Sequence, residues 1–339
     1  MTHRNYHEIV ARDPADCGRQ LGRLFGSIVN GYVADASANP GWQRLKRNAA
    51  PLLEAAAGYF PDCIEELDAY AKTAGIPLID LWTMSIEDEL EEDDEYEKCT
   101  TIVTNGGRLI GHNEDWDEDS AEDICILKKT CGDITTLELY YYGSPLGGTA
   151  VSICSRGYIQ AINSLHHSDM QVGVPKLILA RRIAEIENAE VELPRILEIP
   201  RSSGFAHNLI DRTGKLTAIE CTATRHAVHH PAMPFVHTNH FLNKSLSRFE
   251  TGWDGKSTLR RYDMAMEQTF PAMRRQQLEQ VMDEDTSGRT SSVFNVNTIA
   301  QVIVDLDERT ASIWLRREQR KGWIDYPIEF LFTRPTTTS

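Results

Sequence analysis

The stretch KCTTIVTNGGRLIGHNEDW, residues 98–116, decides how the chain is to be understood. It follows directly on an acidic run, EDELEEDDEYEK (87–98), and begins with a cysteine and two threonines behind a lysine. β-Branched residues, a glycine turn and a second apolar run then predict two strands. The question is whether Cys99 is a buried thiol of the core or a nucleophile at the start of a strand.

The hydrophobic periodicity changes at Cys99. Before it, residues 1–95 are expected to be mostly helical, because apolar residues recur at three- and four-residue spacing, as in 48–75. After it, β-like stretches separated by glycine turns alternate with helical patterns at 174–198 and 257–270. The chain has no internal repeat, so the pattern predicts an α+β protein that forms one folded unit. The acidic segment 87–97 has few apolar residues and is expected to be exposed.

Charge and cysteine content exclude several classes of protein. The net charge of −15 would repel phosphate backbones, so no nucleic-acid partner is expected. No apolar run is long enough to span a bilayer, and the first residues do not resemble a signal peptide, so no membrane partner is expected either. The seven cysteines are scattered and lack CxxC pairs, which argues against a disulfide framework or a structural zinc site. A cytoplasmic protein is therefore expected, with homo-oligomerisation left open.

Cys99 has two interpretations on sequence alone. A lone cysteine that opens a strand is most often a small buried hydrophobe. If the Lys98–Cys99 peptide bond were cut, however, the new α-amine would lie beside the thiol of the same residue. An α-amine has a pKa of about 8, so it can remove the thiol proton. The thiol itself can make the cut by attacking the carbonyl carbon of Lys98, and both interpretations stay open here.

Other polar groups are weaker candidates. Asn113 and Asp115 alternate along a predicted strand, so they point to the same face and suggest a polar site. The histidines between 226 and 240 lack a supporting metal motif, and no metal is expected. Asn239 is either a buried structural amide or a donor to a developing oxyanion. The tyrosines 140–142 are most simply interpreted as filling a strand.

Taken together, these motifs resemble the acyl-coenzyme A:6-aminopenicillanate acyltransferase (isopenicillin-N N-acyltransferase) family. This is peptidase family C45, in the N-terminal-nucleophile hydrolase superfamily. The likeness extends over nearly the whole chain and rests on Cys-Thr at 99–100, GxN at 111–113, NxL…GVP at 163–175 and HTNH at 237–240. Members of the family cut themselves before the Cys-Thr pair and use the freed cysteine as acyl acceptor.

The resemblance implies roles for individual residues. Cys99 matches the nucleophile, Lys98–Cys99 the bond cut in autoproteolysis, and Asn239 the oxyanion-hole asparagine. Asp115 matches an aspartate that takes part in cleavage or orients the new N-terminus. The remaining expected site residues are Thr101 near the nucleophile, Asn113 in the GxN motif, and Asn163 and Ser292 at the substrate. The fungal member has a Ser-Arg pair where this chain reads SSVFNVNTIA (291–300), with no arginine.

The resemblance also implies a fold and an activity. The fold would be a four-layer αββα sandwich, with residues 1–98 as an α-subunit and 99–339 as a β-subunit. The activity would be that of a self-cleaving amidohydrolase that splits a small N-acyl amide through a thioester, without a cofactor. Two alternatives remain: an acyl-CoA-dependent N-acyltransferase, and an uncut relative that binds without catalysis.

Overall fold

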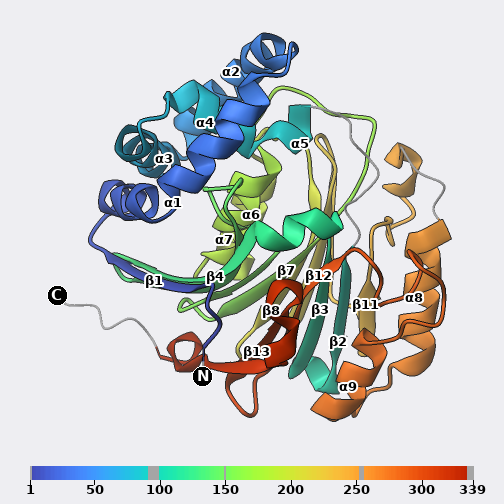
Figure 1. The fold of residues 1–339 in the computed structure, drawn as a ribbon. Coiled ribbons are helices and arrows are strands. Elements are labelled where there is room, and N and C mark those ends of the chain that lie inside the picture. Colours follow the sequence, from blue (N-terminus) through green and yellow to red (C-terminus); the bar gives the residue numbers. More distant parts are fainter. Residues whose placement is uncertain (1, 91–98, 149, 252–255, 334–339) are drawn as a thin grey trace.

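Two β-sheets packed face to face form the centre of the molecule (Figure 1). The computed structural model describes residues 2–90, 99–148, 150–251 and 256–333. The order of the eight-stranded sheet is β1 (Tyr6–Ala11), β4 (Ile124–Cys131), β5 (Ile134–Tyr141), β6 (Val151–Cys154), β7 (Tyr158–Ser164), β8 (Phe205–Asp211), β9 (Leu216–Cys221) and β10 (His226–His229). The order of the six-stranded sheet is β11 (Phe235–His237), β2 (Thr100–Thr104), β3 (Leu109–Asp115), β12 (Thr298–Asp305), β13 (Thr310–Leu315) and β14 (Ile324–Pro327).

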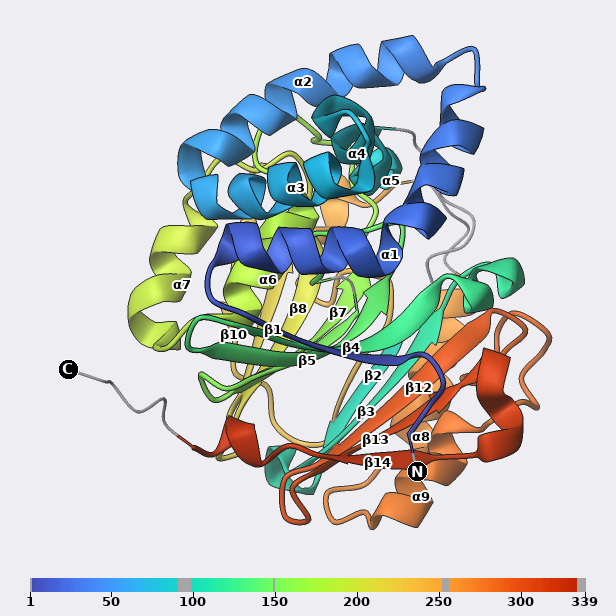
Figure 2. The ribbon, with the colours of Figure 1, turned by 60° about the vertical axis from the view of Figure 1, so that its left-hand side comes forward.

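Helices cover the outer side of each sheet (Figures 1 and 2). On the eight-stranded side lie α1 (Pro14–Ser37), α2 (Trp42–Tyr59), α3 (Pro61–Ala74), α4 (Leu78–Ser85), α5 (Glu87–Leu90), α6 (Lys176–Ala184) and α7 (Ala189–Leu197). On the six-stranded side, α8 (Lys256–Gln268) contacts β11 and β2, and α9 (Arg275–Met282) contacts β3 and β12. The predicted α+β class and four-layer αββα sandwich are therefore confirmed. No helix within the described ranges is both long and apolar enough to cross a membrane.

Apolar residues on both faces of the eight-stranded sheet explain this layering. Along β4, Ile124 and Ile126 point into the core between the sheets, whereas Cys125 and Leu127 point into the core under the helices. All four side chains are buried. Successive strand residues face opposite sides of a sheet, so a stretch that is apolar at every position must be covered by another layer on each face.

The described part of the N-terminal segment, residues 2–90, is mostly helical, as expected, but it also contains a strand that was not expected. It begins with β1, which pairs in parallel with β4 at the edge of the sheet. Helix α1 follows, with Asp13 as N-cap, and packs along α3. A Cβ atom at Gly18 would lie 1.9 Å from the backbone oxygen of Glu66, so only glycine permits this close approach of the two helices. The N-terminal residues thus contribute both a strand and a helical layer to one fold.

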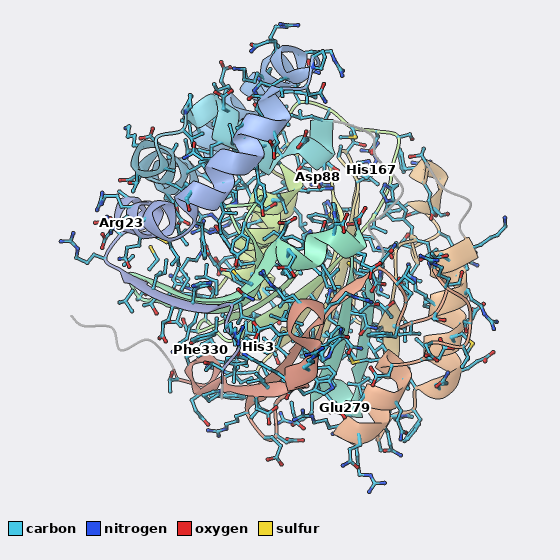
Figure 3. All side chains as sticks on the ribbon, viewed as in Figure 1. His3, Arg23, Asp88, His167, Glu279 and Phe330 are labelled. Atoms are coloured by element: carbon cyan, nitrogen blue, oxygen red, sulfur yellow. The ribbon has the colours of Figure 1, made fainter. Side chains whose placement is uncertain are left out.

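The acidic segment is not exposed throughout, which corrects the prediction for its first part. Glu89 on α5 is buried, and its carboxylate accepts hydrogen bonds from the backbone N–H of Lys176 (2.6 Å) and from the hydroxyl of Ser202. Asp88, labelled in Figure 3, forms an ion pair of 2.8 Å with Lys176. The start of the acidic segment therefore docks on the first turn of α6. Residues 91–98, which include Lys98, lie outside the described residues.

Burial of Glu89 predicts a pH-dependent stability. Desolvation raises its pKa from 4.5 to about 7. The folded state therefore binds a proton that the unfolded state has lost, and stability falls as the pH rises from 4.5 through 7. Glu89→Gln removes this titration, so its stability relative to the wild type should rise by up to about 3 kcal/mol over that range. Urea unfolding of both proteins at about pH 5 and about pH 8 measures the difference. An equal change in the free energy of unfolding of the two proteins between these pH values would contradict the prediction.

Candidate active site

A cavity of about 670 Å³ opens between the helical layer and the ends of the central strands. Its floor includes Cys99, at the start of β2, and Glu114, near the end of β3. Its walls contain aromatic side chains from four parts of the chain: Tyr32, Trp116, Tyr141 and Phe205. The described lining residues also include five further carboxylates, Glu87, Asp88, Asp117, Asp119 and Asp123, and no lysine, arginine or histidine. The cavity is therefore aromatic and strongly acidic.

Cys99 has features of both interpretations. The residue is buried, with 5% of its surface exposed, yet it lines the cavity. Its thiol donates to Glu114 Oε2 at 3.4 Å. Its backbone oxygen accepts from Arg261 Nη1 at 2.8 Å. The residue that carries the thiol therefore borders the cavity.

Behind the thiol, a chain of hydrogen bonds determines the orientation of His112. Thr101 donates its hydroxyl proton to Asn163 Oδ1 (2.9 Å), which also accepts from Asn208 Nδ2. Thr101 Oγ1 therefore accepts from His112 Nδ1, 2.9 Å away. This arrangement turns His112 Nε2 toward Glu114 Oε2, at 2.8 Å. The other oxygen of Glu114 accepts from the hydroxyl of Tyr141 at 2.7 Å.

Asn113 and Asp115 share a face, as predicted, but it is the outer face of the six-stranded sheet. Asn113 Nδ2 donates to the backbone oxygens of Met282 (2.9 Å) and Val293 (2.8 Å). Asp115 accepts from Thr298 Oγ1 at 2.6 Å, and also from Asn295 Nδ2. Strand alternation separates these two side chains from the thiol, which lies with Thr101, His112 and Glu114 on the inner face.

Asn239 is held by a buried arginine. Its Oδ1 accepts from Arg261 Nη2 at 2.7 Å, and its Nδ2 donates to the backbone oxygen of Ser164 at 3.1 Å. The guanidinium therefore directs the amide nitrogen toward Ser164, which lines the cavity. Burial raises the pKa of Asp115 to about 6, and the nearby Arg261 charge opposes that rise. Arg261 thus links the outer-face carboxylate, the candidate oxyanion donor and the backbone of Cys99.

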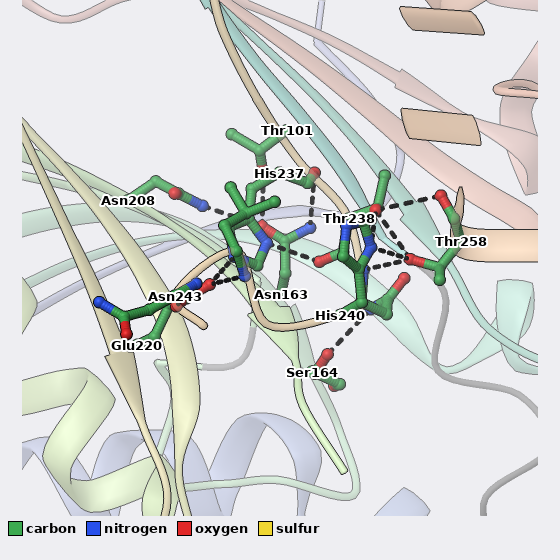
Figure 4. Close-up of polar contacts among 12 residues, drawn as sticks. Thr101, Asn163, Ser164, Asn208, Glu220, His237, Thr238, His240, Asn243 and Thr258 are labelled. Atoms are coloured by element: carbon green, nitrogen blue, oxygen red, sulfur yellow. Dashed lines mark hydrogen bonds and ion pairs between the residues drawn. The ribbon is translucent and has the colours of Figure 1, made fainter. Parts of the chain in front are cut away.

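The expected site residues are only partly brought together. Cys99 and Thr101 lie on the inner face, and Asn239 is joined to Cys99 through Arg261. Asn163 is fully buried, and both atoms of its amide are bonded to protein, with Nδ2 donating to His237 O (Figure 4). Ser292 is also buried, and its hydroxyl donates to Gly288 O at 2.9 Å. Neither side chain lines the cavity, so their substrate-binding roles remain predictions.

The sequence reasoning missed four residues of the site. His112 and Glu114 stand at alternate positions of a predicted strand, so their shared face was already readable from the spacing. Tyr141 is not merely strand filler, because it contacts Glu114 and lines the cavity. Arg261 lies on the buried face of α8, four residues before buried Ala265. An arginine on the buried face of a helix was the available signal, because such a charge needs partners.

The groups able to hold a metal also differ from those first considered. Within the described ranges, the cluster with suitable geometry consists of Cys99, His112 and Glu114, whose ligating atoms all lie within 4.8 Å of one another. Two of the histidines between 226 and 240 have other partners: His237 Nε2 pairs with Glu220 (2.9 Å), and His240 Nδ1 lies 3.1 Å from Thr258 Oγ1 (Figure 4).

Comparison with known proteins places this geometry in context. A family model described as acyl-coenzyme A:6-aminopenicillanic acid acyl-transferase matches residues 103–320, more than half of the chain. No curated protein matches the chain.

Among solved structures, the chain is similar to the conjugated bile acid hydrolase of Clostridium perfringens and the penicillin V acylase of Agrobacterium tumefaciens. For one mutant of the hydrolase, the TM-score is 0.44 at 12% identity, covering 69% of this chain and 92% of that chain. A second variant of the same hydrolase gives 0.47 at 11% identity, covering 68% and 92%. The acylase gives 0.42 at 12% identity, covering 65% and 83%.

Proposed function

Because the chain belongs to the acyl-coenzyme A:6-aminopenicillanic acid acyl-transferase family, we propose that it is a cysteine amidohydrolase that cleaves itself before Cys99. The mature enzyme then splits a small N-acyl amide through a thioester. The observation that carries the proposal is the Cys99 thiol on the floor of a cavity of about 670 Å³. Residues 1–98 form the α-subunit and 99–339 the β-subunit of one folded unit. No cofactor takes part, and the odd, scattered cysteines, none in a disulfide, support a cytoplasmic location.

Self-cleavage requires a base before any α-amine exists. Glu114 is suited to this step, because its Oε2 lies 3.4 Å from the thiol sulfur. The thiol proton passes to Glu114, and the thiolate attacks the carbonyl carbon of Lys98. The C–N bond breaks, the acyl group moves to sulfur, and the amine of Cys99 takes up a proton. Water then hydrolyses the thioester, which leaves a carboxylate on residue 98 and a thiol on residue 99.

Amide hydrolysis follows the same chemistry with a different base. The new α-amine takes the thiol proton, and the thiolate attacks the substrate carbonyl. Asn239 Nδ2 and a backbone N–H stabilise the oxyanion, with Arg261 holding the amide in the required orientation. The α-ammonium returns its proton to the leaving amine, which departs and leaves a thioester on Cys99. Water, deprotonated by the α-amine, releases the acid and restores the thiol.

The character of the cavity favours hydrolysis over transfer from acyl-CoA. Coenzyme A carries several negative charges, which proteins neutralise with arginine, lysine or helix N-termini. The described lining residues offer five carboxylates besides Glu114, and none of those residues is basic. A neutral or cationic amide therefore fits this cavity better than an acyl-CoA does.

The denatured intact mass of the purified protein, followed by an activity screen, tests the proposal. We expect two fragments that meet at the Lys98–Cys99 bond, and release of free amine from members of a panel of N-acyl amines. Acid quenching during turnover should trap the acyl group on the fragment that begins with Cys99. A single uncut mass without amide hydrolysis would overturn the proposal in favour of a non-catalytic binding relative. Transfer that strictly requires acyl-CoA would favour the acyltransferase.

A further inference from the structure

Three different metal-ligating groups lie together beside the cavity, which Cys99 and Glu114 line and His112 does not. They are Cys99 Sγ, His112 Nε2 and Glu114 Oε2, which lie within 4.8 Å of one another on residues that are 5%, 1% and 3% exposed. We propose that these three side chains bind a divalent transition-metal ion, Zn²⁺ foremost, and that the bound ion masks the thiol. Metal binding requires neither self-cleavage nor an acyl substrate, so this inference does not depend on the proposed function.

The hydrogen bonds around His112 determine which of its ring nitrogens faces Glu114. The one hydroxyl proton of Thr101 goes to Asn163, so His112 must use its Nδ1–H to reach Thr101. The Nε2 atom then faces Glu114 Oε2 at 2.8 Å. An imidazole lone pair and a carboxylate oxygen repel each other at that distance unless a proton or a metal ion lies between them. Nε2 is therefore presented as a ligand whenever its proton is displaced.

Both ligands have the supporting hydrogen bonds that metal sites require. A ligating histidine is usually oriented by a hydrogen bond from its other ring nitrogen, and a ligating carboxylate by a donor to its second oxygen. Here Thr101 orients His112, and the hydroxyl of Tyr141 holds Glu114 Oε1 at 2.7 Å. Thr101 is in turn held by Asn163, to which Asn208 also donates. The histidine ring and the carboxylate are thus oriented in advance.

The donor set selects the metal. Thiolate, imidazole and carboxylate together suit Zn²⁺, whereas Mg²⁺ and Ca²⁺ take oxygen ligands. One thiolate and one carboxylate balance the two charges of the ion, and the displaced thiol and imidazole protons pass to solvent. Three protein ligands leave a fourth position for water. The cavity that Cys99 and Glu114 line also contains carboxylates such as Asp117 and Asp119, which attract cations. A thiolate bound to the ion cannot attack a carbonyl; that binding would therefore inhibit the enzyme reversibly is the one consequence that rests on the proposed function.

Titration of the chelator-treated full chain with Co²⁺ tests the site, because thiolate–cobalt bonds absorb in the near ultraviolet. We expect one equivalent to produce this band in the wild type and one equivalent of Zn²⁺ to abolish it. Cys99→Ala should lack the band, whereas Cys154→Ala, which removes a buried cysteine away from the cavity, should retain it. Glu114→Gln replaces a ligand, so it should weaken Zn²⁺ binding by at least the 10- to 100-fold expected when a hydrogen bond that orients a ligand is lost.

A second variant separates metal binding from general damage to the fold. Thr101→Val preserves the side-chain volume but removes the hydrogen bond that orients His112, so it should weaken Zn²⁺ binding about 10- to 100-fold. Its thermal melting without metal serves as the folding control. A band that persists in Cys99→Ala, or no stoichiometric Zn²⁺ in the wild type, would overturn the proposal. Each readout is independent of chain cleavage and amide hydrolysis, so failure here leaves the proposed function to its own test.

Discussion

Replacing Cys99 with alanine is expected to leave one uncut chain of 339 residues that hydrolyses no amide. The change removes the only atom that attacks in either reaction of the proposed mechanism. Loss of a nucleophile lowers kcat by roughly 10⁶-fold in well-studied hydrolases, which brings turnover to the background rate. Denatured intact mass and amine release on the same preparation measure the two effects.

Two companion variants make this result specific. Cys99→Ser keeps a nucleophilic atom of lower reactivity, so it should cleave itself more slowly than the wild type. Cys154→Ala removes a buried thiol from β6, outside the cavity lining, and should cleave and turn over normally. Cleavage in Cys99→Ala would show that another group or a contaminating protease makes the cut. The role of Cys99 would then have to be abandoned.

Replacing Asn239 with alanine is expected to lower kcat by about 10²- to 10³-fold, which corresponds to about 3–4 kcal/mol of transition-state stabilisation. The amide donates to charge that develops only as the carbonyl is attacked, so KM should change little. Asn239→Asp should lose as much, because a carboxylate still accepts the hydrogen bond from Arg261 but cannot donate one to the oxyanion. Steady-state kinetics of both variants on the best substrate of the panel measure the effect.

Gln160, a second buried side-chain amide, serves as a control that distinguishes a role of Asn239 in catalysis from a role in stability. Gln160 is 1% exposed and donates to the backbone oxygen of Ala180 at 2.9 Å, away from the cavity lining. Gln160→Ala should therefore lower the melting temperature with kcat within a few-fold of the wild type. An Asn239→Ala enzyme with full kcat, or a loss in Gln160→Ala of equal size, would remove the assignment of Asn239 as oxyanion donor.

The elements that could be predicted from the sequence are those whose periodicity is strong and local. Helix α3 carries apolar residues every three or four positions, and it lies within the range 48–75 that was expected to be helical. Strand β1 was missed, because only Ile9 and Ala11 of its six residues are buried. Its hydrogen-bonding partner β4 lies more than a hundred residues further along the chain. A short edge strand has too little pattern of its own to be recognised before its partner is known.

The site residues likewise fall into those that a local motif identifies and those that a distant part of the chain supplies. Its nucleophile and its oxyanion candidate stand in short motifs, Cys-Thr and HTNH, so single residues could be named from the chain. The sequence has no arginine at the place near Ser292 that matches the Ser-Arg pair of the fungal member, and the guanidinium at the site comes from α8. Helix α8 contacts β11 and also β2, which lies more than 150 residues earlier in the chain. A local motif therefore cannot report a charge that a distant helix supplies.

The sequence by itself determined the α+β class, the change of period at Cys99 and the identity of the candidate nucleophile. These properties are carried by local spacing, which folding does not alter. Only the tertiary structure decided that Asn113 and Asp115 face away from the thiol, that His112 and Glu114 face it, and that the cavity is acidic. The physical reason is that strand pairing and sheet packing choose which side of each strand is turned inward, and both choices depend on segments remote in the chain.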